Sequence, residues 1–394
     1  MSKRILMMPS GVGWSHATRL RLIADQLVNC DFEIAVLCCA AHRDLFSAYR
    51  RFPTVDVVIT DFASNVFAAY DIELVEQCVR DEMQAISVFQ PDLIVADLRL
   101  TASISSRVAN VPMVSIINAA LGRTFDPVSA LVSGSGWAAR LIGRIVQTQQ
   151  KQALVKIFCR VARQFRLRGL ESLSDFLEGD LTLLADFPQF CPLTAMPNGY
   201  HYVGPIIWEG DSETVHLPTI NPLRPLIYVT IGNTGSAELI HTVINVFRYE
   251  PTYQVIITSG AYAAQAPFEL APHIKLAQFI PGMHILPHAW AVVHCGGSGT
   301  TYQAIRHGIP ALVVPYNNEQ QINARLIQKH HLGRFLSPKQ NLSVELLPAL
   351  EKLADSDHTT AFTLFQALFQ LPGETIAARH IERFLHNRHY LEQT

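Results

Sequence analysis

The sequence predicts an α/β protein with two doubly wound parallel sheets, and three observations support this fold class. Short apolar runs typical of buried strands alternate with longer amphipathic runs typical of helices. The alternation stops near residue 205 and restarts near residue 223, across a segment rich in proline, glycine and polar residues. The chain has 394 residues, of which 49% are apolar, so it can supply two hydrophobic cores.

The first half alternates strands with helices from its start. Helices between successive strands cover both faces of a sheet, which favours parallel strands. Pro91 ends the longest helix, because proline lacks the amide hydrogen that continues one. Strands are expected at Arg4–Met8, Glu33–Cys38, Val55–Ile59, Asp92–Ala96 and Met113–Ile117, and helices at Thr18–Val28, Ile72–Phe89 and Ala102–Ala109.

The second half repeats this pattern. We expect two Rossmann-like domains at residues 1–205 and 223–394, a linker at 206–222, and ligands at the carboxyl ends of the strands. Strands are expected at Pro225–Ile231, Tyr253–Thr258, Trp290–His294 and Ala311–Val314, with a helix at Glu238–Phe247.

Composition argues against several classes of protein. A net charge of −2 does not suit a general nucleic-acid binder. The seven cysteines are scattered without a Cys-x-x-Cys pair, which favours a reducing, cytoplasmic setting over a disulfide or metal framework. The first apolar run is too short for a signal peptide, and no run of about 18 apolar residues predicts a membrane span.

One glycine-rich segment lies where a buried strand should meet a helix. Residues 294–303 read HCGGSGTTYQ, after the apolar run Ala289–Val293. Glycines let the backbone approach a ligand, and the first amides of a helix together with its dipole attract anions. With a histidine and three hydroxyl groups, the segment predicts a diphosphate site. The alternative is a glycine-rich connection with a capping serine or threonine.

Residues 294–334 resemble the donor-binding signature of the GT-B glycosyltransferases of the UDP-glycosyltransferase superfamily. The family pattern is roughly H-x-G-G-x-G-T, an acidic residue, G-x-P, a proline, an aspartate–glutamine pair and N-A, and this chain reads HCGGSGTTYQAIRHGIPALVVPYNNEQQINARLIQKHHLGR. The resemblance implies two Rossmann-like domains facing across a cleft. It also implies transfer of a sugar from a UDP or dTDP sugar, without a metal or other cofactor. A last helix at Thr375–Leu391 would cross back onto the first domain.

The resemblance implies roles for residues around this segment. Gln303 stands where the family usually has a glutamate that binds the ribose hydroxyls, and an amide gives up charge-assisted hydrogen bonds. Glu319 and Gln320 replace the usual aspartate–glutamine pair that holds the sugar hydroxyls. The residues expected to hold the nucleotide and its diphosphate are Gly232, Asn233, Thr234, Phe279, Ile280, His294, Gly297, Ser298, Gly299 and Thr300.

A second glycine-rich segment, SGVGWSHATRL at residues 10–20, follows the first strand. A dinucleotide-binding G-x-G-x-x-G nearly fits, but His16 occupies the third glycine position and the second strand ends without an acid for a ribose. The segment instead resembles the first loop of the same superfamily, with Gly13 as a candidate nucleotide contact. Arg19 stands where other branches have proline.

His16 and Asp97 are the candidate catalytic residues. A sugar hydroxyl attacks an anomeric carbon better when a base takes its proton, and histidine suits that role near neutral pH. In much of the superfamily an aspartate at the end of a later strand orients the base, and Asp97 follows the strand Asp92–Ala96. An Asp97–His16 hydrogen bond would fix the tautomer and stabilise the imidazolium. The alternative is that both residues only cap helices.

The region at about 128–170 is basic and amphipathic. It could lie on an anionic membrane or meet an anionic acceptor, or it could be a solvated excursion whose apolar face packs on the sheet. Its basic residues are Arg140, Arg144, Lys151, Lys156, Arg160, Arg163, Arg166 and Arg168.

These features together predict an inverting, metal-independent glycosyltransferase with His16 as the base. Its partners would be a nucleotide sugar and a small-molecule or lipid acceptor, with no nucleic acid. We expect a cytoplasmic protein. The alternative is a peripheral position at the inner face of the membrane. Two rivals are a silent auxiliary subunit that activates another glycosyltransferase, and a nucleotide-sugar epimerase or hydrolase on the same fold.

Overall fold

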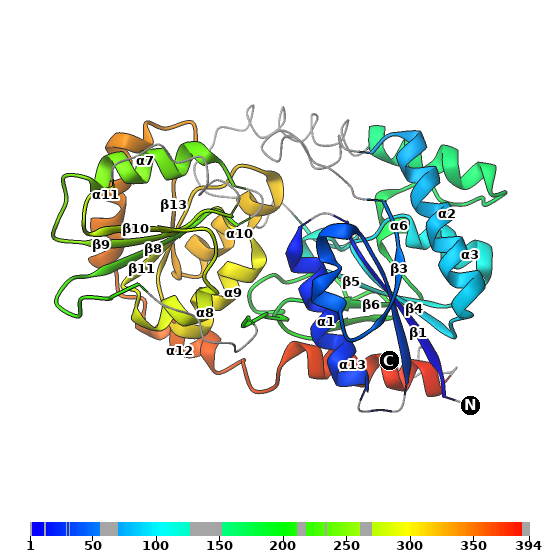
Figure 1. The fold of residues 1–394 in the computed structure, drawn as a ribbon. Coiled ribbons are helices and arrows are strands. Elements are labelled where there is room, and N and C mark those ends of the chain that lie inside the picture. The colour runs from blue at the N-terminus through cyan, green and yellow to red at the C-terminus, as the bar shows by residue number, and fades with distance from the viewer. Residues whose placement is uncertain are drawn as a thin grey trace. The chain divides into compact units, whose positions relative to one another are not determined.

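The structure is a computed structural model that describes residues 2–387, apart from residues 12, 29, 31, 56–69, 127–151, 211–217, 233–234 and 261–269. These residues form two compact units (Figure 1). The first holds the chain up to Ile206 and again from Leu371, and the second runs from Ile207 to Gln370.

The first unit is built on a seven-stranded sheet in which every neighbouring pair is parallel. The strand order is β3-β2-β1-β4-β5-β6-β7, so the direction of winding reverses between β1 and β4. Doubly wound sheets bind ligands at such a switch point. The strands are β1 (Arg4–Pro9), β2 (Glu33–Cys38), β3 (Arg50–Pro53), β4 (Leu93–Asp97), β5 (Met113–Ile117), β6 (Leu181–Leu184) and β7 (Tyr200–Tyr202).

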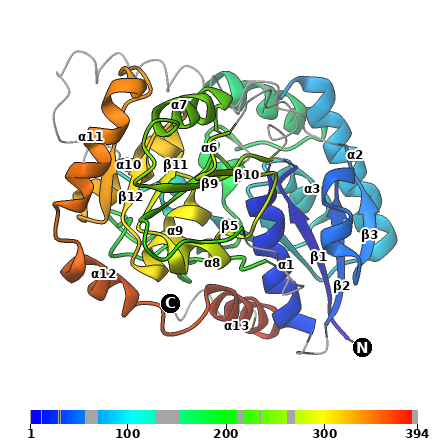
Figure 2. The same ribbon diagram turned by 60° about the vertical axis from the view of Figure 1, so that its left-hand side comes forward.

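Helices cover both faces of this sheet (Figure 2). Ile5 and Met7 face one side, where α1 (Trp14–Val28) packs together with α13 (Gly373–His386). Leu6 and Met8 alternate to the other side and meet α2 (Ile72–Phe89) and α3 (Ala102–Ala109). A short helix, α6 (Leu173–Leu177), contacts α3.

The second unit repeats the order with six parallel strands, β10-β9-β8-β11-β12-β13. Its strands are β8 (Leu226–Thr230), β9 (Gln254–Thr258), β10 (Ile274–Ala277), β11 (Ala291–His294), β12 (Ala311–Val313) and β13 (Gly333–Phe335). Its helices are α7 (Ala237–Phe247), α8 (Gly282–Ile285), α9 (Ser298–His307), α10 (Asn318–Lys329), α11 (Leu342–Ala354) and α12 (Thr359–Gln366). The prediction of two doubly wound parallel sheets is confirmed.

Two expected elements differ from the structure. The third strand is β3 (Arg50–Pro53), whereas we expected Val55–Ile59; Val55 is not in a strand and residues 56–59 lie outside the described residues. The first helix begins at Trp14 instead of Thr18, because no glycine or proline follows Gly13 to delay it. His16 therefore lies in the first turn of α1 and not in a loop.

Part of the basic region forms a helix over residues 152–164 whose apolar face is buried. Phe158 is fully buried, with its ring edge-on to Tyr70 and Phe176. Lys156, Arg160 and other cationic residues of this segment are exposed. The apolar face of this helix therefore packs against Tyr70 and α6, while Arg140, Arg144 and Lys151 lie outside the described residues. Within the described ranges, no helix is long and apolar enough to cross a membrane.

Candidate functional site

The switch point of the first sheet brings the first glycine-rich segment to the end of β4. Pro9, the last residue of β1, pairs with Asp97, the last residue of β4. Gly13 has φ of 74°, in the left-handed region that favours glycine, and this turn leads the chain from β1 into α1. His16 in the first turn of α1 is thereby placed beside Asp97.

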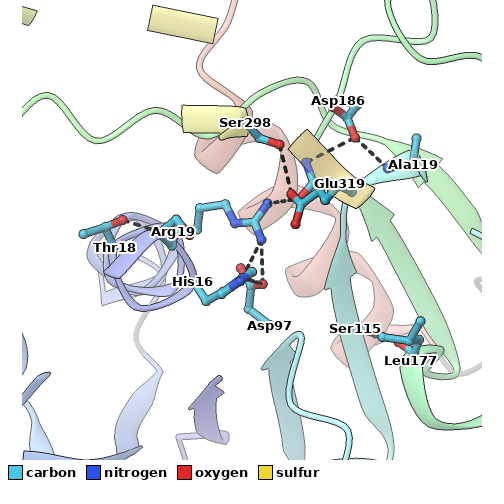
Figure 3. Close-up of polar contacts among 12 residues, drawn as sticks. His16, Thr18, Arg19, Asp97, Ser115, Ala119, Leu177, Asp186, Ser298 and Glu319 are labelled. Carbon is cyan, nitrogen blue, oxygen red and sulfur yellow. Dashed lines mark hydrogen bonds and ion pairs between the residues drawn. The ribbon is translucent and has the colours of Figure 1, made fainter. Parts of the chain in front are cut away.

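His16 and Asp97 form the predicted hydrogen bond (Figure 3). His16 Nδ1 lies 2.7 Å from Asp97 Oδ1, and the Asp97 side chain is fully buried. We assign the proton to Nδ1, which donates it to the Asp97 carboxylate; the nearby Arg19 Nη2, which can only donate, then directs its hydrogen to Asp97 Oδ1 and not to the ring. This leaves Nε2 as the ring's acceptor. The His16 side chain is 13% exposed, so the pair can meet a ligand at one edge. Its catalytic role stays a prediction.

Arg19 joins this pair, which the sequence did not predict. One turn after His16 on α1, its Nη2 donates to Asp97 Oδ1 at 2.7 Å and lies 2.8 Å from His16 Nδ1. Its Nη1 donates to Asn118 Oδ1 at 3.1 Å, just beyond β5. Figure 3 shows the Arg19 side chain reaching from α1 to the other two.

In the second unit, the HCGGSGTTYQ segment turns from β11 into α9. Gly297 is the N-cap residue and supplies no side-chain cap, so helix geometry leaves the amides of Ser298, Gly299 and Thr300 without intrahelical acceptors. A Cβ on Gly297 or Gly299 would have no heavy atom within 4 Å. The open amides and the positive end of the helix dipole form a site suited to an anion.

Two residues predicted to hold the sugar lie at the start of α10. Glu319 Oε1 accepts a long, 3.4 Å hydrogen bond from Ser298 Oγ, so the predicted sugar and diphosphate residues are neighbours (Figure 3). Gln320 is 2% exposed, and its Oε1 accepts from the amides of Tyr316 and Asn317. The Gln320 carboxamide therefore fastens the start of the helix, and its role toward a sugar stays a prediction.

His294 at the end of β11 is 1% exposed. Its Nδ1 accepts from the amide of Gly296 at 3.0 Å, so its proton is on Nε2, which has no hydrogen-bond partner in the described part of the chain. Burial lowers the pKa of His294 to about 3. At neutral pH the ring can therefore offer a neutral N–H, but no positive charge, to a phosphate.

The buried, neutral His294 should make the fold sensitive to acid. An unfolded histidine titrates near pH 6.5, so the stability from keeping this ring neutral is fully present above that pH and is lost as pH falls toward about 3. Between pH 7 and pH 5 the loss should be about 2 kcal/mol. Urea unfolding at several pH values measures it. His294→Asn keeps an acceptor for Gly296 and cannot titrate, so an unchanged pH dependence in that variant would contradict this assignment.

The turn at residues 278–282, which holds the expected nucleotide contacts Phe279 and Ile280, forms an aromatic pair with one residue that the sequence did not indicate. Phe279 is 61% exposed and stacks on Trp208 with ring centroids 5.9 Å apart. Gln303 Nε2 donates to the Trp208 carbonyl at 3.0 Å. A Cβ on Gly282 would come within 2.8 Å of Gln303 Oε1, so glycine there leaves room for the amide. Ile280 is buried and cannot offer a surface.

The remaining expected site residues are placed only in part. Gly232 follows β8 with φ of 55°, whereas Asn233 and Thr234 lie outside the described residues. Among the described residues, no three His, Cys, Asp or Glu side chains are grouped as a metal ion would require.

Comparisons with known proteins agree with this arrangement. Residues 250–366 match the family model described as erythromycin biosynthesis protein CIII-like, C-terminal domain. A PGL/p-HBAD biosynthesis rhamnosyltransferase of Mycobacterium bovis (strain BCG / Pasteur 1173P2) is 27% identical over 353 residues, covering 85% of this chain and 77% of the relative.

Solved structures of similar fold cover nearly the whole chain. The glycotransferase of kitacinnamycin has a TM-score of 0.77 at 17% identity, covering 98% of this chain and 100% of that one. The glycosyltransferase VinC, solved with dTDP, has a TM-score of 0.68 at 17% identity, with 97% and 99% covered. The fold is therefore that of the GT-B glycosyltransferases. Over most of its length the chain is therefore similar to glycosyltransferases, as the resemblance to the UDP-glycosyltransferase superfamily implied.

Proposed function

We propose that this chain moves a sugar from a nucleoside diphosphate sugar to a hydroxyl group of a small-molecule or lipid acceptor. The observation that carries the proposal is the 2.7 Å contact between His16 Nδ1 and the buried Asp97 carboxylate at a switch point of the sheet. A partly exposed imidazole held in one tautomer by a buried carboxylate is what general-base catalysis of a hydroxyl attack needs.

The proposed reaction is a single displacement. His16 Nε2 accepts the proton of the acceptor hydroxyl while its oxygen forms a bond to the anomeric carbon. The bond between that carbon and the diphosphate oxygen breaks, and the diphosphate leaves with the electron pair. Attack opposite the leaving group inverts the anomeric configuration. The amides at the start of α9 would stabilise the leaving group, so no metal or cofactor enters the proposal.

The donor in this proposal carries 2′-deoxyribose, as dTDP sugars do. Gln303 Nε2 is committed to the Trp208 carbonyl, which leaves Oε1 as the acceptor for a sugar hydroxyl. A ribose diol would place two donors against this oxygen, whereas the deoxyribose of a nucleoside diphosphate has one free hydroxyl. Two hydroxyls that share one neutral oxygen form weaker hydrogen bonds than the charge-assisted pair a carboxylate offers, so the second hydroxyl of a ribose gains little here. The VinC structure with dTDP supports this choice of donor.

Calorimetric titration with UDP, dUDP and dTDP tests the donor. UDP and dUDP differ in the 2′-hydroxyl alone, and we expect dUDP to bind about tenfold more tightly. Gln303→Glu should reduce this ratio, because a carboxylate accepts both hydroxyls of a diol. The matched control is Gln328→Glu, which adds the same charge on an exposed part of α10. Equal binding of UDP and dUDP would refute the deoxyribose preference, and no binding of any nucleotide would favour the auxiliary-subunit rival.

The acceptor is proposed from the named relatives. One is named for PGL/p-HBAD biosynthesis and the other is the glycotransferase of kitacinnamycin, so we propose a lipid or natural-product hydroxyl for this chain. Product analysis with and without acceptor separates a transferase from the epimerase or hydrolase rival. Peripheral membrane contact through the basic region stays a prediction.

A further inference from the structure

A row of polar side chains follows the carboxyl edge of the first sheet across four neighbouring strands. His16 and Arg19 come from α1 after β1, Asp97 ends β4, Asn118 follows β5, and Asp186 lies two residues beyond β6. All except His16 are at most 7% exposed. Since ligands bind at this edge of doubly wound sheets, the row lies where chemistry is expected.

Hydrogen bonds connect the row from end to end. Asp97 Oδ1 accepts from His16 Nδ1 and from Arg19 Nη2, both at 2.7 Å. Arg19 Nη1 donates to Asn118 Oδ1 at 3.1 Å, and Asn118 Nδ2 donates to Asp186 Oδ2 at 3.3 Å. Asp186 Oδ2 also accepts from the amide of Ala119 at 2.6 Å (Figure 3). Asn118 after β5 and Asp186 after β6 therefore help to hold Arg19 in place.

The Asp97 carboxylate needs a positive partner. It is fully buried, and its Oδ2 has no hydrogen-bond partner within the described residues. An unpaired buried carboxylate is so costly that it pairs with a cation or takes up a proton. Arg19 supplies that cation and is always protonated. Without Arg19, the remaining ion-pair partner of Asp97 within the described residues is His16, and a protonated imidazole cannot act as a base.

We propose that Arg19 is a positioning residue that neutralises Asp97 and so keeps His16 unprotonated and able to accept a proton at neutral pH. The inference rests on the proposed role of His16 as the base. Asp97 still fixes the tautomer of His16. The positive charge of Arg19 balances the negative charge of the Asp97 carboxylate while His16 is neutral. Asn118 and Asp186 keep the guanidinium on Asp97, where it does not reach outward to substrate.

Two further titratable side chains at this edge, Arg99 and His42, contact other partners. On the side of α2, Arg99 donates from Nε to the buried Glu82 at 2.5 Å and from Nη1 to the carbonyl of Pro9 at 3.3 Å. On the side of β2, His42 Nδ1 lies 3.3 Å from the thiol of Cys39. Asp97 therefore forms ion pairs with both His16 and Arg19.

The test compares pH profiles of kcat/KM for the full-length wild type, Arg19→Gln and Arg19→Lys. Removing a charge this close should move the acid limb of the Arg19→Gln profile to higher pH by about one to three units, with activity recovered in alkaline buffer. Arg19→Lys keeps the charge and should keep the acid limb of the wild type. Two results for Arg19→Gln would overturn the proposal. One is a loss of kcat/KM by the same factor at every pH, and the other is an acid limb at the same pH as in the wild type.

A second measurement needs no turnover. The ring carbon shifts of His16 in NMR spectra report whether the imidazole is protonated at pH 7. We expect a neutral ring in the wild type and in the control Arg80→Gln, whose arginine is exposed on α2, and a protonated ring in Arg19→Gln. A neutral ring in Arg19→Gln overturns the inference. If His16→Ala instead leaves turnover unchanged, the proposed function fails, and the NMR result still shows whether Arg19 sets the charge on His16.

Discussion

Replacing His16 with alanine should lower kcat by about 10²- to 10⁴-fold, the range that a positioned general base contributes. The acceptor hydroxyl would then have to attack before it loses its proton to a base. Nucleotide affinity should not change, because His16 is proposed to contact the acceptor hydroxyl, whereas the amides at the start of α9 are proposed to hold the diphosphate. Release of nucleoside diphosphate measures kcat, and calorimetry measures nucleotide binding.

Two further variants separate catalysis from folding. His288→Ala removes an exposed histidine outside both candidate sites and should leave turnover unchanged. Asp97→Asn should cost nearly as much as His16→Ala, because an amide cannot hold the Nδ1–H tautomer as a carboxylate does. The losses should not add in the double variant, since both residues serve one proton transfer. Normal turnover by His16→Ala would remove the base assignment.

The central strands of both sheets could be predicted because their apolar runs are buried on both faces. The expected strand Met113–Ile117 coincides with β5, and the expected helix Ile72–Phe89 coincides with α2. The edge strand β3 at Arg50–Pro53 was not expected. It begins Arg50-Arg51 and ends in Pro53, and such charges and prolines protect the edges of sheets while they hide the apolar pattern.

The candidate site could be predicted where one residue directly follows a strand or a glycine turn. His16 and Asp97 were found in this way, and Asn118 and Asp186 also follow strands. Arg19 could not be assigned, because its role depends on partners from two other strands that meet only in the folded sheet.

Burial was the other unpredictable part of the site. His294 and Gln320 fit a family pattern as ligand contacts, yet both side chains are enclosed by tertiary packing and bond to the backbone. Trp208 lies within the expected linker at 206–222, where no pattern indicated an aromatic partner for Phe279. These features depend on which segments pack together, and that information is not local in sequence.

Replacing Gly297 with aspartate should separate the stability of the protein from its affinity for the donor. Gly297 has φ of −64° and ψ of 141°, which any residue adopts, and a Cβ there meets no atom within 4 Å. Aspartate is among the best N-cap residues, so the melting temperature should not fall. The new carboxylate would accept from the same amides that we propose bind the diphosphate, and its charge would repel it. We therefore expect nucleotide affinity to fall about 100-fold.

Gly297→Asn distinguishes the two causes of this loss. Asparagine also caps a helix but carries no charge, so it should occupy the amides and reduce affinity by about tenfold. The difference between the two variants then measures the repulsion. A glycine at an N-cap where aspartate would stabilise the helix is a sign that the site serves a ligand at a cost in stability. If Gly297→Asp kept its nucleotide affinity, that explanation would be wrong, and the segment would be a strand–helix connection without a binding role.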